Sequence, residues 1–240
     1  FGTGLSSGIQ GVFSDILGRN QIYATAAVNG EIYDFGGQVA YINQENRINW
    51  GAVVSHIPYV SGQVSAVLDN LPTQGGGTVT VYNERYDIIR TFEDQFQVFG
   101  SYPFSRYHRF EAGSGVSRYS YRIDRYNNYY DYNNGFIGYP IGANKEKVSR
   151  EEAQQTYGVD FKPFTTYQLN GAFVGDNSFS GVTSPLAGFR YRVGIENYQG
   201  DYKLSALTAD GRKYVRIKPI TLAARLYSYS RFGRDETRLY

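Results

Sequence analysis

Apolar and polar residues alternate strictly in several segments of this chain, for example over residues 21–28, 63–69 and 188–196. In the last of these, Phe189, Tyr191, Val193 and Ile195 alternate with glycine and charged residues. Side chains on a β-strand point to opposite faces with a period of two, so such segments predict strands with one apolar and one polar surface. The question is whether the apolar surface packs on a protein core or on lipid.

The same pattern divides most of the chain into strands. It predicts hairpins of 8–17 with 21–28, 37–43 with 49–58, 63–69 with 78–90 and 95–102 with 109–123, then strands at 164–174, 186–197, 202–217 and 220–232. Residues 124–163 are expected to form a long loop, with one helix that begins at Ser149, uses Glu152 in a capping box and ends at Gly158. Short and long connections alternate, as in outer-membrane barrels.

Composition supports a membrane barrel over a soluble sandwich. Aromatic residues make up 17% of the chain, including 24 Tyr and 15 Phe, and barrels carry aromatic girdles at both membrane interfaces. The fold class is therefore predicted as all-β, an antiparallel transmembrane β-barrel with roughly 10–12 strands visible. Residues 1–240 are expected to form a single barrel domain that is incomplete at one or both ends, because the tail 234–240 loses the alternation that a closing strand should keep.

Charge and cysteine content limit the possible functions. Lys and Arg number 24 against 22 Asp and Glu, and the basic residues are spread along strands, so no nucleic-acid partner is expected. The chain has no cysteine, which excludes disulfides and thiolate chemistry. It also has no run of eighteen apolar residues, so no transmembrane helix is predicted.

The chemistry-bearing motifs are weak, and the chain is expected not to be an enzyme. Gly4-Leu5-Ser6-Ser7-Gly8 matches the nucleophile-elbow pattern but lacks the preceding strand and following helix that an elbow needs. The only two histidines, His56 and His108, do not make a zinc site without cysteine. No catalytic residue, metal site or cofactor is predicted.

Two groups of residues are candidate contact sites. By alternation alone, Arg190, Arg192, Glu196 and Arg225 are candidates for a polar lumen wall. The Tyr- and Asn-rich part of the expected outer loop supplies candidate contacts for sugars or a protein partner, although solvation of the loop explains the same composition. These residues are Tyr126, Asn128, Tyr129, Tyr130 and Tyr132.

Four strings along the chain resemble one family. They are residues 11–18 (GVFSDILG), residues 49–51 (NWG) with 57–59 (IPY), residues 102–111 (YPFSRYHRFE), and residues 210–214 (DGRKY) followed by 222–226 (LAARL). They are similar to the bacterial surface antigen family, within the BamA-like superfamily of outer-membrane assembly and translocation barrels, and most of all to the barrel that follows a TolB-like propeller.

The resemblance implies a sixteen-stranded barrel in the bacterial outer membrane that assists insertion or translocation of proteins at a seam between its first and last strands. Its implied partners are the lipid bilayer and other envelope subunits or a periplasmic propeller. The arginine-containing lumen-loop motif of the family is absent from this chain, so no functional residue is transferred. The alternatives are a passive pore or a membrane anchor of a propeller and, in another class, a soluble secreted β protein that binds glycans.

Overall fold

The computed structural model describes residues 6–73, 75–181 and 184–237, and almost all of them lie in antiparallel strands. One helix and one short 3-10 helix, η1 (Ile32–Asp34), interrupt the strands in this part of the chain. The strands are β1 (Ser6–Ser14), β2 (Asn20–Asn29), β3 (Phe35–Asn43), β4 (Asn49–Pro72), β5 (Thr78–Pro103), β6 (His108–Asn133), β7 (Phe136–Lys147), β8 (Phe164–Asp176), β9 (Phe179–Ser180), β10 (Pro185–Gly200), β11 (Leu204–Ile217) and β12 (Ile220–Phe232).

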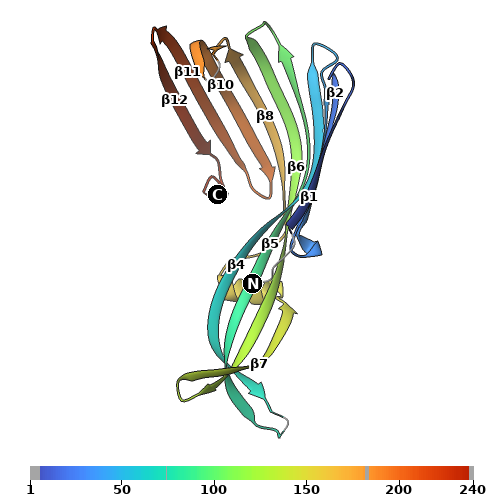
Figure 1. Cartoon of the computed structure of the whole chain (residues 1–240), viewed down its shortest axis with the longest axis vertical. Helices are drawn as coiled ribbons and strands as arrows, with labels where there is room; N and C mark the ends of the chain where they lie inside the picture. Colours follow the sequence, from blue (N-terminus) through green and yellow to red (C-terminus); the bar gives the residue numbers. More distant parts are fainter. Residues whose placement is uncertain (1–5, 74, 182–183, 238–240) are drawn as a thin grey trace. The chain divides into compact units, whose positions relative to one another are not determined.

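The strands form one sheet in the order β1-β2-β3-β4-β5-β6-β8-β10-β11-β12, with β7 paired to β6 and β9 paired to β10. Strands β8, β10, β11 and β12 lie side by side in Figure 1. The prediction of an all-β antiparallel fold is thus confirmed. Within the described residues no pairing joins β1 to β12, so the sheet is not closed into a barrel.

The chain divides into two compact units. Unit 1 comprises residues 1–57, 94–118 and 164–240, and unit 2 comprises residues 58–93 and 119–163. Strands β4, β5 and β6 each contribute residues to both units. The expectation of a single barrel domain stays a prediction.

Three strands are much longer than the sequence indicates. Residues 63–69 are not a separate strand, since they belong to β4, and residues 78–90 and 95–102 are parts of the single 26-residue strand β5. The expected loop 124–163 is also wrong in its first half. There β6 continues to Asn133 and turns at Asn134-Gly135 into β7. Both turn residues have positive φ, 48° and 89°, which Asn and Gly adopt readily in two-residue hairpin turns.

The predicted helix is present as α1 (Arg150–Tyr157). The Ser149 hydroxyl accepts a hydrogen bond from the Glu152 backbone N–H, and Gly158 ends the helix in the left-handed conformation. The reciprocal half of the capping box is not formed, because the Glu152 carboxylate pairs with Arg125. Helix α1 packs through Ala153 on a small core of unit 2 that includes Ile123 and Val148.

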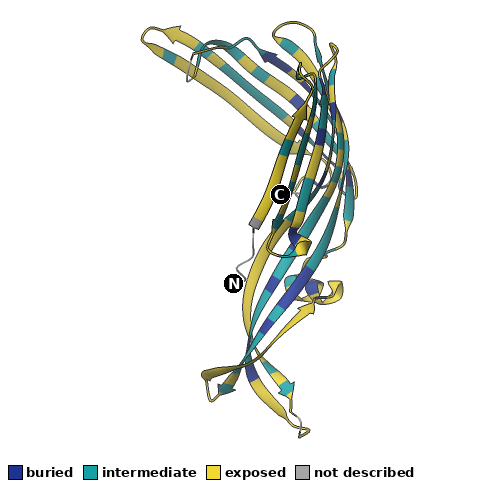
Figure 2. Cartoon of the chain, turned by 45° about the vertical axis from the view of Figure 1, so that its right-hand side comes forward, coloured by how far each residue is buried: buried dark blue, intermediate teal, exposed yellow. Residues whose placement is uncertain are grey.

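The strands of unit 1 have one apolar and one polar face, as the alternation predicts. Apolar residues of neighbouring strands lie opposite one another: Val39 pairs with Val54, Phe173 with Val193, and Ile195 with Leu207. We call the surface that these residues share the apolar face. Its exposed members include Ile9, Phe13, Val39, Val54, Phe173, Val193, Ile195, Leu207, Val215, Leu222 and Leu226. Figure 2 shows exposed residues along most strands rather than one continuous buried core.

The opposite surface of unit 1, the polar face, carries amide, hydroxyl and charged side chains. It includes Gln10, Thr25, Gln38, Ser55, Asn170, Arg190, Arg192, Glu196, Asp210, Arg212 and Arg225. The same face continues through β5 and β6. A Cβ on Gly115 of β6 would lie 3.3 Å from the Cβ of Gln97 of β5, so these two positions share a face. Glu111 of β6 lies on that face and pairs with Arg192 of β10. Buried residues of this face include Ala40, Ala172, Val174 and Leu204.

Candidate functional site

The four candidate lumen residues lie together on the polar face. Arg190 is opposite Arg212 in the register, and Arg192 is opposite Asp210. Arg225 of β12 is opposite Arg212 from the other side. Glu196 lies further along β10, on the same face, and accepts a hydrogen bond from the Tyr198 hydroxyl at 3.1 Å. Alternation alone therefore placed all four side chains on one surface, while their role in a lumen stays a prediction.

Ion pairs connect the arginines of this surface. Arg190 lies 2.6 Å from Asp176, and Arg192 pairs with Glu111. Asp210 binds two guanidinium groups, Arg212 at 2.8 Å and Arg225 at 2.9 Å. Asp210 and Arg212 are not among the lumen residues predicted from the sequence, although they alternate along β11 with residues of the opposite face, as the predicted residues of β10 do. A cavity of about 540 Å³ opens beside Glu111 and Arg192 and is lined also by Arg109 and Asn170.

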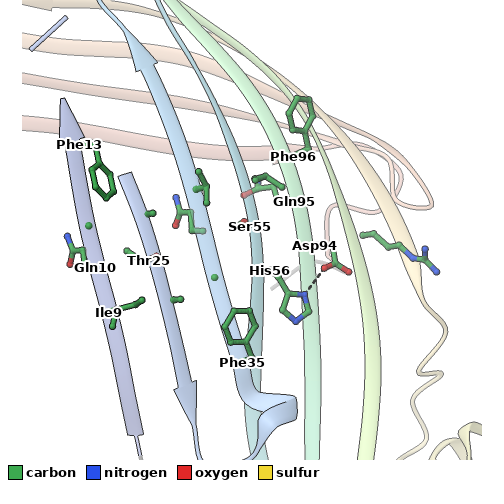
Figure 3. A pocket seen from close by; sticks show the side chains of 18 of the residues that line it. Ile9, Gln10, Phe13, Thr25, Phe35, Ser55, His56, Asp94, Gln95 and Phe96 are labelled. Carbon is green, nitrogen blue, oxygen red and sulfur yellow. Dashed lines mark hydrogen bonds and ion pairs between the residues drawn. The ribbon is translucent and has the colours of Figure 1, made fainter. Parts of the chain in front are cut away.

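A groove of about 910 Å³ lies over strands β1 to β6 of unit 1. Figure 3 shows Ile9, Phe13, Phe35 and Phe96 around it. At its edge His56 Nδ1 lies 2.6 Å from Asp94 Oδ1, and both side chains are partly exposed. Most of the rest of the lining belongs to the apolar face, and Gln10, Thr25, Gln38 and Ser55 of the polar face also contribute. Single-strand patterning gave no sign of this groove, because its walls come from several strands.

Aromatic rings gather on the apolar face near the short β5–β6 turn. The imidazole of His108 stacks on Phe173 with ring centres 6.0 Å apart, and Tyr191 lies 6.1 Å from His108. Phe104 of the turn lies 6.1 Å from Phe173, and Phe189 lies 5.8 Å from Tyr191. Amphipathic and aromatic rings in a band are typical of a membrane–water interface.

Unit 2 contains a buried charge network. Arg125 donates to Asp87 through Nε and Nη2, at 2.8 and 2.9 Å, and pairs through Nη1 with Glu152 of α1. The Tyr157 hydroxyl donates to the same Asp87 carboxylate. Burial alone would raise the pKa of Asp87, but the hydrogen bonds from Arg125 and Tyr157 outweigh it and lower that pKa. Burial and the contact with Asp87 raise the pKa of Tyr157 to about 12.

A second buried pair in unit 2 joins Arg90 to Asp124 at 2.5 Å, and both side chains are almost completely inaccessible to solvent. Asp124 also binds the more exposed Arg122 at 2.9 Å. The four buried charged residues of these networks are all paired: Arg125 with Asp87, and Arg90 with Asp124. Charged side chains are tolerated inside a protein when they are paired in this way. We assign these networks a structural role.

The candidate outer-loop residues lie on strand β6 rather than in a loop. Tyr126, Asn128, Tyr130 and Tyr132 alternate along β6 with residues of the opposite face, where Tyr129 lies. Lys145 lies over the Tyr126 ring at 4.8 Å, and Tyr130 lies 6.2 Å from Tyr82. Burial raises the pKa of Tyr129. The rings are therefore held by their neighbours in the sheet and only partly exposed.

The remaining motifs give no site in the described part of the chain. Gly4 and Leu5 of the elbow-like string lie outside the described residues, and Ser6 to Gly8 begin strand β1. Among the described residues no group of three or more His, Asp or Glu side chains is arranged to hold a metal ion. No helix in residues 6–73, 75–181 and 184–237 is long and apolar enough to cross a membrane.

Comparison with known proteins gives no relative: no protein-family model matches the chain, and no curated protein or solved structure matches it significantly.

Proposed function

We propose that this chain forms part of the wall of a non-enzymatic β-barrel in the bacterial outer membrane. The observation that carries the proposal is the apolar face of unit 1, on which large apolar side chains such as Phe13, Phe173 and Leu226 are exposed over successive strands. An apolar surface of this extent needs a partner. A bilayer covers such a surface while the polar face lines an aqueous interior.

Strand lengths agree with this proposal. A tilted strand needs about 9–11 residues to cross a bilayer, and β8, β11 and β12 have 13, 14 and 13 residues. Strands β4, β5 and β6 have 24 to 26 residues, so about half of each has to lie outside the hydrocarbon layer. We assign the residues of unit 2 to the aqueous side, because their paired buried charges need no lipid contact.

The edges of the sheet require partners in a membrane. Backbone N–H and C=O groups left unpaired in hydrocarbon each cost several kcal/mol. We therefore propose that further strands, from the same polypeptide or from a second chain, pair with β1 and β12. Sixteen strands in total is the number implied by the resemblance to the bacterial surface antigen family.

The connections of unit 1 do not distinguish its two ends. The turns after β1, β3, β5 and β11 lie at one end, since successive strands are antiparallel, and are two to five residues long. The connection after β10, at the other end, has only three residues. Assistance with insertion or passage of polypeptide is the activity that the resemblance favours over a passive pore or a propeller anchor.

Membrane fractionation followed by gel electrophoresis, with and without heating in detergent, tests the barrel. The expected result is partition of the full-length protein into the outer membrane and a band that changes mobility on heating. A soluble protein with no heat-dependent shift would exclude a lipid-facing apolar face. In that case, glycan binding by the tyrosines of β6 would be the function to test.

A further inference from the structure

Positive charge is concentrated on the polar face of strands β10 to β12. Two carboxylates of these strands, Glu196 and Asp210, accompany six guanidinium groups there. The excess of four positive charges is larger than the net charge of +2 of the whole chain. The arginines are Arg190, Arg192, Arg212, Arg216, Arg225 and Arg231.

Carboxylates of nearby strands pair with two of these arginines, Arg190 with Asp176 and Arg192 with Glu111, so an excess of two positive charges remains. Asp210 is shared between Arg212 and Arg225. Arg216 donates a 3.4 Å hydrogen bond to the Thr221 hydroxyl, and no described carboxylate lies within ion-pair distance of it. The side chains of Arg190, Arg192 and Arg225 are each about half exposed, at 53%, 48% and 54%. These guanidinium groups therefore keep N–H donors available to a ligand.

The spacing of the arginines fits an extended chain. Residues two apart on a strand, such as Arg190 and Arg192, lie on one face at a step of about 6.6 Å, and Arg212 and Arg216 lie two such steps apart with Tyr214 between them. An extended polypeptide presents alternate side chains at the same step. Guanidinium groups bind carboxylates through two parallel hydrogen bonds, which an ammonium group does not provide.

We propose that the polar face of β10–β12 binds an extended acidic polypeptide segment, with alternate carboxylates held by these arginines. The inference rests on the proposed function and adds to it the chemical class of the polypeptide that the lumen accepts. A small inorganic anion would bind one arginine at a time and could not contact several of the regularly spaced arginines at once.

Two substitutions test the surface without leaving a carboxylate unpaired. Arg216→Gln removes a guanidinium group that has no carboxylate partner among the described residues, and Arg225→Gln leaves Asp210 bound to Arg212. The matched control is Lys213→Gln with Lys218→Gln. Lys213 lies on β11 but on the apolar face, 5.9 Å from the Phe189 ring, and Lys218 lies in the following turn. Both double variants lose two positive charges.

The experiment measures fluorescence anisotropy of a labelled peptide of alternating Glu and Ser, titrated with the full-length protein in detergent micelles. The expected affinity of the double arginine variant is at least about twofold weaker than that of the unchanged protein, since exposed ion pairs contribute about 0.2–1 kcal/mol each. The lysine variant should bind as the unchanged protein does. Raising the salt concentration should weaken binding of the unchanged protein.

Equal losses of peptide affinity in the two double variants would overturn the inference. So would binding of a Lys-Ser peptide to the unchanged protein with the same affinity as the Glu-Ser peptide. The heat-dependent gel shift of each variant separates this outcome from failure of the proposed function. A protein that shifts on heating but binds the peptide independently of Arg216 and Arg225 would refute the acidic-segment site alone. A protein that never shifts would refute the barrel, whatever the peptide does.

Discussion

At the scale of single residues, Asp87 is a tightly constrained side chain of unit 2. It accepts hydrogen bonds from Arg125 and Tyr157, and its side chain is 5% exposed. Removing one partner of a buried ion pair leaves the other charge without compensation, which typically costs about 3–5 kcal/mol. Asp87→Asn should therefore destabilise unit 2 by that amount, measured by chemical denaturation of the protein in detergent.

The matched control for Asp87→Asn is Arg150→Gln. Arg150 forms an exposed ion pair with Asp160 at 2.7 Å, and solvent screens exposed pairs so that they contribute little to stability. Losses of similar size in the two variants would contradict the view that burial makes the Asp87 pair important.

The pKa values of Asp87 and Tyr157 predict a pH window for the docking of α1. The pKa of Asp87 is lowered in the folded state, so its contribution is complete above about pH 4 and is lost as the pH falls below it. The pKa of Tyr157 is raised to about 12, so its contribution is complete below about pH 10 and is lost as the pH rises towards 12. Amide hydrogen exchange of residues 150–157 should show strong protection between these limits and less on both sides, whereas loss of protection between pH 5 and 9 would contradict this assignment.

At the scale of elements, the sequence predicts strands best where one face is apolar without interruption. The strand at 220–232 is predicted with the bounds that β12 has, and β10 extends the predicted 186–197 by only a few residues. The breaks expected near Pro58 and near Glu93-Asp94 are wrong. Their polar groups are satisfied across strands, as His56 pairs with Asp94 and Tyr119 donates to Glu93. Such partners are far apart in sequence, so the pattern of a single strand does not reveal them.

Prediction of the candidate sites from the sequence is limited in the same way. Alternation placed Arg190, Arg192, Glu196 and Arg225 on one face, because the face depends only on local period. It did not reveal that Arg225 and Arg212 share Asp210, which requires the register between β11 and β12. The tyrosines of β6 were assigned to a loop because Asn and Asp suggest turns, whereas their pairing with β7 keeps them in the sheet.

Glycine at position 51 of β4 is required by a close approach. A Cβ there would lie 2.6 Å from the Phe99 ring and 2.6 Å from the Tyr41 carbonyl oxygen, whereas a Cβ on Gly211 would meet nothing within 4 Å. Gly51→Ala should therefore lower the free energy of unfolding by about 1–3 kcal/mol. Gly211→Ala should leave it nearly unchanged. Denaturation in detergent compares the two variants, and equal stability would contradict the packing of Phe99 over Gly51.

The assignment of faces predicts an asymmetry between two arginine substitutions. Val193→Arg places a charge on the apolar face, which should cost about 2–4 kcal/mol if this position lies near the middle of the bilayer. Gln38→Arg places the same charge on the polar face, at an exposed position, and should change stability little. Folding into lipid vesicles, followed by denaturant titration, measures both. Equal tolerance at the two positions would contradict the proposed orientation of the sheet.

At the scale of the whole molecule, the two units differ in what they expose and what they bury. Residues of unit 1 present a largely apolar face, whereas residues of unit 2 bury paired charges and pack α1 on a small apolar core. Composition averaged over the chain conceals this division, since the apolar fraction of 41% is ordinary for a soluble protein. The division emerges only from the contacts of each unit.

Strand β12 also makes the molecule convenient for chemical labelling. Nearly all of its residues are exposed, its two faces alternate, and the chain has no cysteine. A cysteine introduced at any one position of 220–232 would be the only thiol in this sequence. A water-soluble maleimide should then modify every second position, those that share a face with Arg225, while a lipid-soluble reagent should modify the intervening ones.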